Sequence, residues 1–296
     1  MEVRPIIKGV ISGFATTLGL TSNTVIVLAL SSIAYKEKCL LPAETILFTL
    51  TGANLLLLSS FGIPHALFLL GVKSFYSDLG CKFDGHFVRS SRVMIIGLTC
   101  LLSCFQGATL ASTHHTWAII KAKMQKHLLL LIAFILTIST VTSLTPALYN
   151  TVNTNITGLK YVINSGYCLT VYPNSFLLTV NGMIFFARDV IFVILMAVAS
   201  SYIIVTLHRH GKQMKGKRSS DRNDKNSAEE QAAKMVVTFV IIYVLVFGIE
   251  NIIWFYQISH SEEGAEKSIM DREHMLRDWH DSERYRHTSS ILRATK

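Results

Sequence analysis

Residues 128–149 read LLLLIAFILTISTVTSLTPALY, a stretch of 22 residues without one charged side chain. A helix of this length covers about 30 Å, the thickness of the hydrocarbon core of a bilayer. The core of a soluble domain does not need so long an apolar run. Because lipid offers no hydrogen-bond partner to unpaired backbone groups, the stretch predicts a membrane-spanning helix.

Similar apolar blocks lie on both sides of this stretch. They cover residues 10–34, 42–72, 86–112, 176–207 and 233–256. Only 16% of the 296 residues are charged and 50% are hydrophobic, whereas soluble domains have about 25% charged residues. The predicted fold class is therefore all-α, a polytopic membrane helix bundle over residues 1–257. The first block predicts an uncleaved span, since no small-residue cleavage site follows it.

Lysine and arginine residues are unevenly distributed between the segments that connect the blocks. With the N-terminus outside, the inner segments hold 13 of them and the outer segments hold five. Cytoplasmic loops carry such an excess, so the distribution predicts an extracellular N-terminus. Asn155 begins an N-glycosylation tripeptide in a predicted outer loop. That tripeptide also occurs by chance, so alone it is weak evidence.

Residues 208–232 form a polar, basic segment before the last apolar block. We predict a flexible cytosolic loop that lies near anionic lipid and any cytosolic partner. A purely topological role of its cations is the alternative interpretation. No aromatic side chains are interleaved with these cations, so the net charge of +9 does not indicate nucleic-acid binding. The cations considered for partner binding are Arg209, Lys212, Lys215, Lys217 and Arg218.

Five polar residues of the third block fall on one face of the predicted helix. They are Arg89, Arg92, Thr99, Ser103 and Gln106. Turning charged groups to lipid costs several kcal/mol, so this face is expected to line the bundle interior or a water-filled cavity. We predict ligand-binding roles for the two arginines and interhelical polar roles for Ser103 and Gln106. The alternative is that both arginines snorkel to the outer headgroups.

Two further segments place charges inside the predicted spans. Arg188 and Asp189 are adjacent in the fifth block. Adjacent helical residues are about 100° apart, so we expect that they do not simply neutralise each other and that at least one pairs across helices. Glu250 near the outer end of the sixth block is interpreted as a partner of Arg92 or Arg188, a ligand contact, or a solvated interfacial residue. Arg188 and Glu250 complete the predicted ligand-binding set.

Two residue pairs are predicted to have structural roles. Asn23 and Asn54 are single amides within apolar blocks, and such amides commonly form hydrogen bonds between helices. Cys81 and Cys168 both lie on the oxidising side of the predicted topology, and pairing them would tie an outer loop over the mouth of the bundle. They are the two outward cysteines of this topology.

No arrangement of residues supports catalysis. Cys39 has no neighbouring histidine, and the apolar blocks contain no Ser-His-Asp or paired-carboxylate arrangement. The sequence also lacks a glycine-rich phosphate loop, a zinc-type CxxC pair and an HExxH motif. We therefore expect a protein that is not an enzyme and has no catalytic residue, metal site or cofactor.

The third and fifth blocks carry motifs that resemble those of a known family. The third block reads Arg89-x-x-Arg92-x7-Cys100-Leu-Leu-Ser-Cys-Phe-Gln106, and the fifth runs from Arg188-Asp189-Val190 to His208-Arg209-His210. Both are similar to vomeronasal type-1 receptors and their fish relatives, the ora receptors. The segment SAEEQAAK at 227–234, Asn54, the two outward cysteines and the glycosylation tripeptide add to the resemblance over about residues 1–257. The inner run HHTW at 114–117 favours the fish branch.

The resemblance implies a seven-span G-protein-coupled receptor of the sensory-neuron plasma membrane. Such a receptor would bind a small pheromone or odorant between the outer halves of its helices and signal to a heterotrimeric G protein. Six spans are visible here, and residues 258–296, with seven cations and eight anions, cannot cross a bilayer. We therefore expect a seventh span that is missing or replaced, as by a frameshift or an alternative transcript.

Two other functions are alternatives to this one. A bitter taste receptor has a similar seven-span plan, but its third-span and fifth-span patterns are not visible. A six-span transporter or channel subunit would use the charged residues to line an ion route. No inverted repeat or pair of broken helices supports that interpretation.

Overall fold

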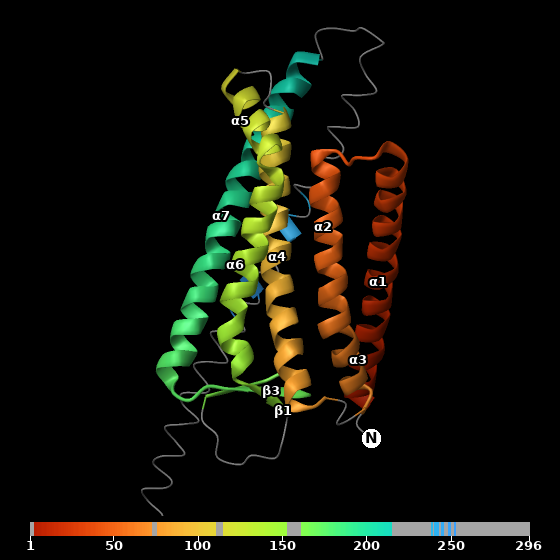
Figure 1. Ribbon diagram of the computed structural model, residues 1–296, viewed down its shortest axis with the longest axis vertical. Coiled ribbons are helices and arrows are strands. Elements are labelled where there is room, and N and C mark those ends of the chain that lie inside the picture. The colour runs from red at the N-terminus through yellow and green to blue at the C-terminus, as the bar shows by residue number, and fades with distance from the viewer. Residues whose placement is uncertain are drawn as a thin grey trace, which may run out of the picture. The chain divides into compact units, whose positions relative to one another are not determined.

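A computed structural model describes residues 3–72, 76–110, 115–152 and 161–214, together with 238, 240–242, 244, 245, 248, 249 and 252. They belong to two compact units that divide between Leu245 and Val246. In the first unit, five helices are long and apolar enough to cross a membrane (Figure 1). The predicted class, a membrane helix bundle, is therefore confirmed. Nine residues of the block 233–256 are described, and the tail 258–296 lies outside the described residues.

The long helices contain most of the residues of the first five predicted spans. Charged residues and one capping hydrogen bond lie at the helix ends, where they stabilise the helices. Asp78 lies in the first turn of its helix and Lys36 in a last turn, which complements the helix dipole. Glu44 accepts a hydrogen bond from the backbone N–H of Leu41 at 2.8 Å, just before Pro42 starts a helix. The helices that cover the predicted spans are α1 Val3–Glu37, α2 Pro42–Leu57, α3 Ile63–Leu69, α4 Asp78–Leu110, α6 Leu128–Leu148 and α7 Ser175–Met214.

The second predicted span is interrupted rather than continuous. Between α2 and α3, residues Leu58–Gly62 form a π-helical turn, η1, in which the N–H of Ile63 bonds the carbonyl of Leu58. Pro64 follows immediately and has no N–H, and its ring would clash with the carbonyl of Ser60 in a regular α-helix. The wider turn relieves that clash while the chain remains helical.

Two helix boundaries differ from the prediction, and one further helix was not predicted. Helix α4 begins at Asp78, so Cys81 lies inside the helix and not before it. The first turns of α4 are polar and glycine-rich, which hid them from a search for apolar runs. Helix α7 continues to Met214, so residues 208–214, which were predicted to belong to a flexible loop, are helical. A further helix, α5 His115–Lys126, precedes α6.

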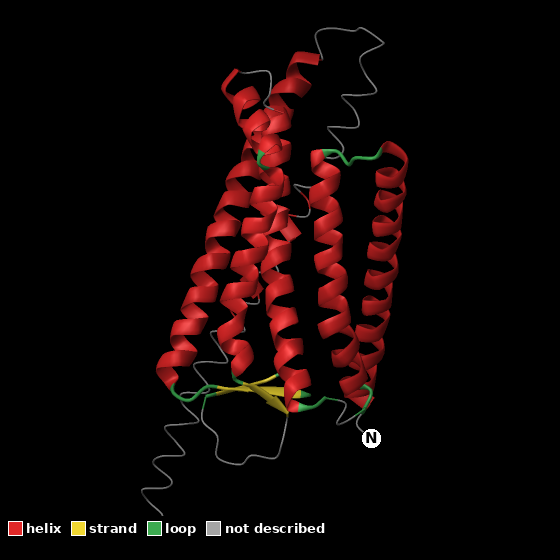
Figure 2. Ribbon diagram, viewed as in Figure 1, coloured by secondary structure: helices red, strands yellow, loops and turns green. Residues whose placement is uncertain are grey.

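A small antiparallel sheet lies at one end of the bundle, a feature that the all-α prediction missed. Strand β3, Cys168–Val171, is central and pairs with β1, Asn150–Val152, and with β2, Val162–Asn164. The register sets Val152 opposite Cys168 and Asn164 opposite Leu169. Strands of three or four residues are too short for an alternating pattern to be recognised. The sheet lies at the same end as the N-terminus (Figure 2).

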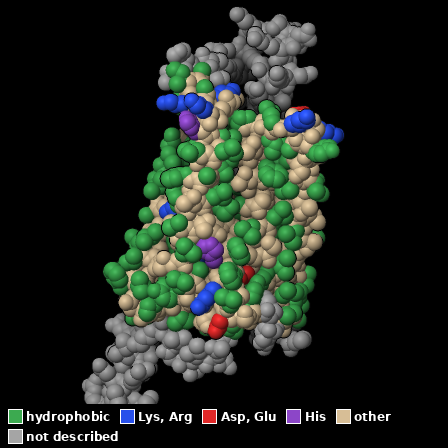
Figure 3. Space-filling view, viewed as in Figure 1, with side chains coloured by type: hydrophobic (Ala, Val, Ile, Leu, Met, Phe, Trp, Pro, Cys, Tyr) green, Lys and Arg blue, Asp and Glu red, His purple; other side chains and the backbone are tan. Residues whose placement is uncertain are grey.

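Helix α4 is the centre of the first unit. Half of its most apolar window is buried, compared with 6% for α1 and for α7. Ile46 of α2, Leu98 of α4 and Ile132 of α6 share one buried cluster. The outer faces of the helices are covered by apolar side chains, while most visible Lys and Arg side chains gather at the end opposite the sheet (Figure 3). Such an apolar surface is suited to contact with acyl chains.

Small residues bring α1 close to the second span. A Cβ at Gly9 would lie 3.1 Å from Leu69, and one at Gly19 would lie 2.9 Å from Leu58. Small residues allow helix backbones to approach closely in membranes. Deeper along the interface, the amide Nδ2 of Asn54 donates to Oδ1 of Asn23 at 3.2 Å. These two amides therefore link α1 directly to α2.

This close approach predicts that Gly62→Val destabilises the protein. A Cβ at Gly62 would lie 2.8 Å from Cγ2 of the buried Thr16, and overpacking costs about 1–3 kcal/mol. Thermal unfolding of the detergent-solubilised chain should show a lower midpoint. Gly52→Val is the matched control, because a Cβ at Gly52 meets nothing within 4 Å. Equal midpoints for the two variants would contradict the packing.

Candidate functional site

The polar face of α4 has two parts with different surroundings. Its outer turns carry Asp78, Cys81, Asp84 and Arg89, which contact the sheet and the segment before α4. Its middle turns carry Thr99 and Ser103, whose hydroxyls donate to carbonyls of their own helix at 2.7 and 2.9 Å. Only the outer part therefore joins α4 to the sheet.

Arg89 is held by side chains of the sheet. Its Nη2 donates to Oγ1 of Thr170 at 2.9 Å, and both terminal nitrogens lie 3.4 Å from Oδ1 of Asn150. The same Oδ1 accepts from Oγ1 of Thr170 at 2.6 Å, and Nδ2 of Asn150 donates to the carbonyl of Cys81 at 3.1 Å. Asn150 and Thr170 are both buried, so Arg89 supplies further donors to acceptor atoms that are shielded from water.

Two further contacts fasten the sheet to the same side of α4. The carboxylate of Asp78 accepts from Oγ1 of Thr151 at 2.8 Å and from the N–H of Val152 at 2.9 Å. One turn later, Cys81 forms the predicted disulfide with Cys168, with the two Cα atoms 5.8 Å apart. We call Asp78, Cys81, Arg89 and their partners in β1 and β3 the sheet anchor. It fixes the sheet over the outer end of the bundle.

An aromatic cluster surrounds a buried carboxylate beside the disulfide. Asp84 accepts hydrogen bonds from the hydroxyls of Tyr76, at 2.9 Å, and Tyr167, at 3.3 Å. The two tyrosine rings are stacked with centroids 5.7 Å apart. Burial, and then the nearby Asp84 carboxylate, raise the pKa of both tyrosines well above the usual range. Both hydroxyls therefore remain protonated donors at physiological pH.

Arg188 and Asp189 form an ion pair within helix α7. Nε of Arg188 lies 2.8 Å from Oδ1 of Asp189, and the two side chains are only 14% and 19% exposed. This differs from the expectation that the pair does not neutralise itself, because the long arginine side chain bends back across the 100° separation. The expected interhelical contact is also present, since Nη1 of Arg188 donates to Oγ1 of Thr142 at 2.9 Å. The guanidinium carbon lies 5.0 Å from the ring centroid of Phe185.

The other predicted site residues are distributed differently. Arg92, one turn along α4 from Arg89, has an exposed side chain. Gln106 has an Oε1 atom that is buried without a hydrogen-bond partner among the described residues. The side chains outside the described residues are those of Asn155, Arg209, Lys212, Lys215, Lys217, Arg218 and Glu250.

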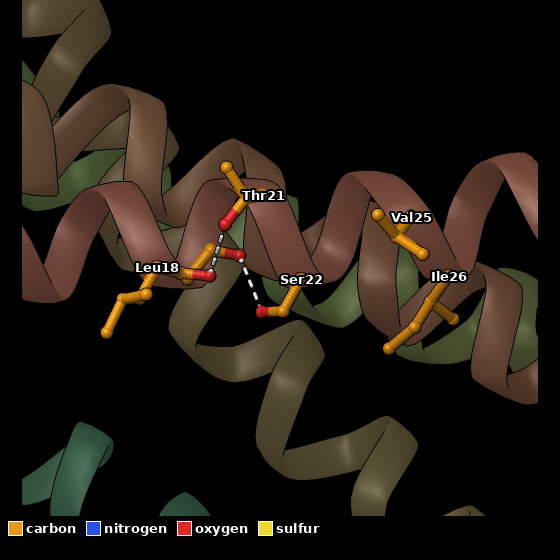
Figure 4. A pocket seen from close by; sticks show the side chains of 6 residues that line it. Leu18, Thr21, Ser22, Val25 and Ile26 are labelled. Carbon is orange, nitrogen blue, oxygen red and sulfur yellow. Dashed lines mark hydrogen bonds between the residues drawn. The ribbon is translucent and has the colours of Figure 1, made fainter.

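A groove on α1 offers little chemistry for recognition. Its walls are Leu18, Gly19, Thr21, Ser22, Val25 and Ile26 (Figure 4). The hydroxyls of Thr21 and Ser22 donate to carbonyls of their own helix at 3.0 and 3.1 Å. Within the described ranges, no group of three or more His, Cys, Asp or Glu side chains could hold a metal ion. The charged residues of α4 and α7 are therefore the stronger candidate site.

Comparison with known proteins identifies the family of the chain. Residues 10–270 match the model of the vomeronasal organ pheromone receptor family. The chain belongs to this family. The match continues beyond residue 257, where the sequence motifs placed the end of the resemblance. The family is one of seven-span receptors and not of enzymes.

Relatives from fish and mammals cover most of the chain. Olfactory receptor class A-like protein 1 of Danio rerio is 30% identical over 260 residues, 88% of this chain and 81% of the relative. Vomeronasal type-1 receptor 4 of Homo sapiens is 32% identical over 197 residues, 65% of each protein. Vomeronasal type-1 receptor 90 of Rattus norvegicus is 28% identical over 257 residues, 85% of this chain and 81% of the relative.

Most contacts of the sheet anchor in this member of the vomeronasal receptor family were not predicted from the sequence. Asn150 and Thr170 are ordinary polar loop residues by sequence, and they lie 61 and 81 positions from Arg89. Asp84 and Tyr167 are 83 positions apart. Nothing in the local pattern indicates such contacts. The two outward cysteines were the one available signal that the loop and α4 meet.

Replacing Arg89 with leucine should loosen the sheet. The substitution leaves Asn150 and Thr170 short of a donor in a buried setting, which costs about 1–3 kcal/mol. We expect amide hydrogen exchange in β1 and β3 to become about tenfold faster or more. Lys82→Leu, at an exposed position of the same helix, is the control and should leave exchange unchanged. Unaltered exchange in Arg89→Leu would show that the sheet does not depend on this contact.

The disulfide predicts a specific pattern of thiol chemistry. Peptide mapping without reductant should recover a cross-linked peptide that contains Cys81 and Cys168, and alkylation after unfolding should label Cys39, Cys100 and Cys104. The Cys81→Ala/Cys168→Ala variant should lose about 2–5 kcal/mol of stability, seen as a lower midpoint of thermal unfolding. A cross-linked peptide with any other pair of cysteines would contradict this assignment.

Proposed function

We propose that the chain is a chemosensory receptor that binds a small pheromone or odorant in the outer half of its helix bundle and signals to a heterotrimeric G protein. The names of its relatives, which are olfactory and vomeronasal receptors, support this function. The observation that carries the ligand site is the mostly buried Arg188 and Asp189 pair of α7, in which Arg188 also contacts Thr142 of α6. Charged residues held within membrane spans are costly and mark functional sites by default.

The proposed ligand site is the region between α4, α6 and α7 below the sheet. Of the four predicted residues, Arg92 and Arg188 are proposed as direct contacts, and Glu250 is retained as a candidate. Arg89 is better described as a positioning residue, since its donors are engaged by Asn150 and Thr170. Arginines suit carboxylate or sulfate groups through paired hydrogen bonds. A ligand would activate the receptor only through its differential affinity for two helix arrangements.

The signalling side is proposed at the end of the bundle opposite the sheet. Lysines of the α1–α2 turn and of α5 lie there, and the segment 208–232, which begins in the last turns of α7, is also rich in basic residues. Arg209, Lys212, Lys215, Lys217 and Arg218 are proposed to face the G protein and anionic headgroups. This orientation places the N-terminus and Asn155 outside the plasma membrane, where Asn155 would be glycosylated.

The receptor proposal predicts a dose-dependent effect of Arg92→Ala. In cells that express the chain with a promiscuous G protein, carboxylated and sulfated odorants should evoke calcium signals, while ion or solute flux through the protein should be absent. Losing one charge-assisted contact of about 1.5–3 kcal/mol raises the half-maximal dose of an anionic agonist at least tenfold. Lys82→Ala is the control at an exposed outer position of α4. Identical responses of Arg92→Ala at every dose would remove Arg92 from the site.

A further inference from the structure

Three sulfur-containing side chains gather where α4 contacts α7. Cys100 of α4 and Met196 of α7 belong to one buried cluster, and Cys104 of α4 packs against it. Cys100 is 5% exposed and Met196 is fully buried. The thiols of Cys100 and Cys104, one helical turn apart, interact with each other, and neither residue forms a disulfide. Two free thiols and a thioether from two helices therefore share this cluster.

The alignment of α4 and α7 sets a serine at the level of Cys104. Both helices run from the sheet toward the opposite end of the bundle (Figure 1). A Cβ at Gly107 would lie 3.7 Å from Cγ1 of Ile203, 96 positions further along the chain. The buried thiol and the thioether are also 96 positions apart, about two turns before this contact. Because the same separation relates Cys104 to Ser200, these residues lie at one level between the two contacts.

The hydroxyl of Ser200 is a buried donor without an acceptor. Ser200 is 5% exposed, and its Oγ has no hydrogen-bond partner among the described residues. By contrast, the hydroxyls of Thr99 and Ser103 on α4 donate to carbonyls of their own helix. Leaving a buried donor unpaired is costly. A negatively charged sulfur ligand beside Ser200 would accept its hydrogen bond, and such donors are a regular feature around metal ligands.

The donor atoms match a soft metal ion. Thiolate and thioether sulfur select copper(I) among the metals that proteins bind. Structural zinc sites take four ligands from cysteine, histidine and carboxylate side chains, and methionine is not one of these. The spacing of Cys100 and Cys104 differs from that of a zinc-type CxxC pair, and the thioether comes from another helix. Local motifs therefore gave no indication of a metal site here.

We propose that Cys100, Cys104 and Met196 bind one copper(I) ion, and that Ser200 donates a hydrogen bond to the thiolate of Cys104. As the copper–sulfur bond forms, the Cys104 thiol releases its proton, so one positive charge replaces another. The net charge of the site is unchanged, which matters because uncompensated charge within a span is costly. Cys104 is only half-buried, which gives the ion a path of entry.

The proposed copper site is separate from the proposed ligand site. Met196 lies about two turns further along α7 than Asp189, and none of the three sulfur residues contributes to the sheet anchor. An ion held by ligands from both α4 and α7 stabilises the contact between these helices, because it binds only the folded arrangement. The inference therefore stands or falls independently of the receptor function.

Copper(I) titration of the full-length chain in lipid nanodiscs, under argon and with ferrozine as the competing chelator, tests the site. The wild type should retain one equivalent of copper(I), and its midpoint of thermal unfolding should rise by about 5 °C. Zinc at the same concentration should leave the midpoint unchanged. Met196→Leu keeps the side-chain volume but removes the sulfur, so it should weaken copper(I) binding about tenfold or more.

Two control variants show whether binding is specific to the cluster. Met183→Leu changes an exposed methionine of the same helix, and Cys39→Ser removes an exposed thiol. Both should bind copper(I) as the wild type does. Ser200→Ala should weaken binding about tenfold, because the thiolate loses its hydrogen bond. The X-ray absorption spectrum of the copper-loaded wild type should show sulfur neighbours only.

Three results would overturn the proposal. The first is a wild-type protein that retains no copper(I), which would make the sulfur cluster a matter of packing only. The second is equal affinity in Met196→Leu and Met183→Leu. The third is a nitrogen or oxygen ligand in the X-ray absorption spectrum, a test that needs no variant. If Met196→Leu does not fold, Cys104→Ser at its half-buried position replaces it, with Cys39→Ser as the matched control.

Discussion

Hydrocarbon provides no hydrogen-bond partner, so polar groups within the bundle are stabilised by partners elsewhere in the chain. The threonine and serine hydroxyls of α4 donate to carbonyls one turn away, and Asn54 donates to Asn23 across a helix interface. The strongest case is the guanidinium of Arg188, which meets a carboxylate, a hydroxyl and an aromatic face. A charged side chain inside the bundle whose hydrogen-bonding groups are only partly paired is costly, so it indicates a functional role.

Helix α4 meets this requirement in different ways along its length. Its outer turns bind the sheet through Asp78, the disulfide and Arg89. Its middle turns provide the apolar contacts that hold α2, α6 and α7 together, with Leu98 fully buried. A helix that is fixed at one end and packed on several sides can transmit a change at its outer half to the opposite end. This arrangement suits a receptor whose ligand and G protein are proposed to bind at opposite faces of the membrane.

The two arginines at the start of the family motif have separate tasks in this arrangement. Arg89 is engaged with buried side chains of the sheet, so it shapes the outer boundary of the proposed pocket. Arg92 lies one turn further along α4, where its side chain is exposed. The spacing of three residues places both on one side of α4, but the contacts with Asn150 and Thr170 are made by Arg89. A shared helical face is therefore weaker evidence for a shared function than a shared set of contacts.

The sequence by itself determined the membrane class, the approximate positions of five spans, the family and the cysteine pair. These follow from the length of apolar runs and from local motifs, which do not depend on what packs against them. Tertiary structure alone decided the short sheet, the polar first turns of α4, and the partners of Arg89, Asp84 and Arg188. Asn150 and Thr170 join Arg89 from 61 and 81 residues away, and no local periodicity encodes such a contact. Likewise, the adjacent positions of Arg188 and Asp189 do not encode that the arginine bends back to its neighbour while it also reaches Thr142 of α6.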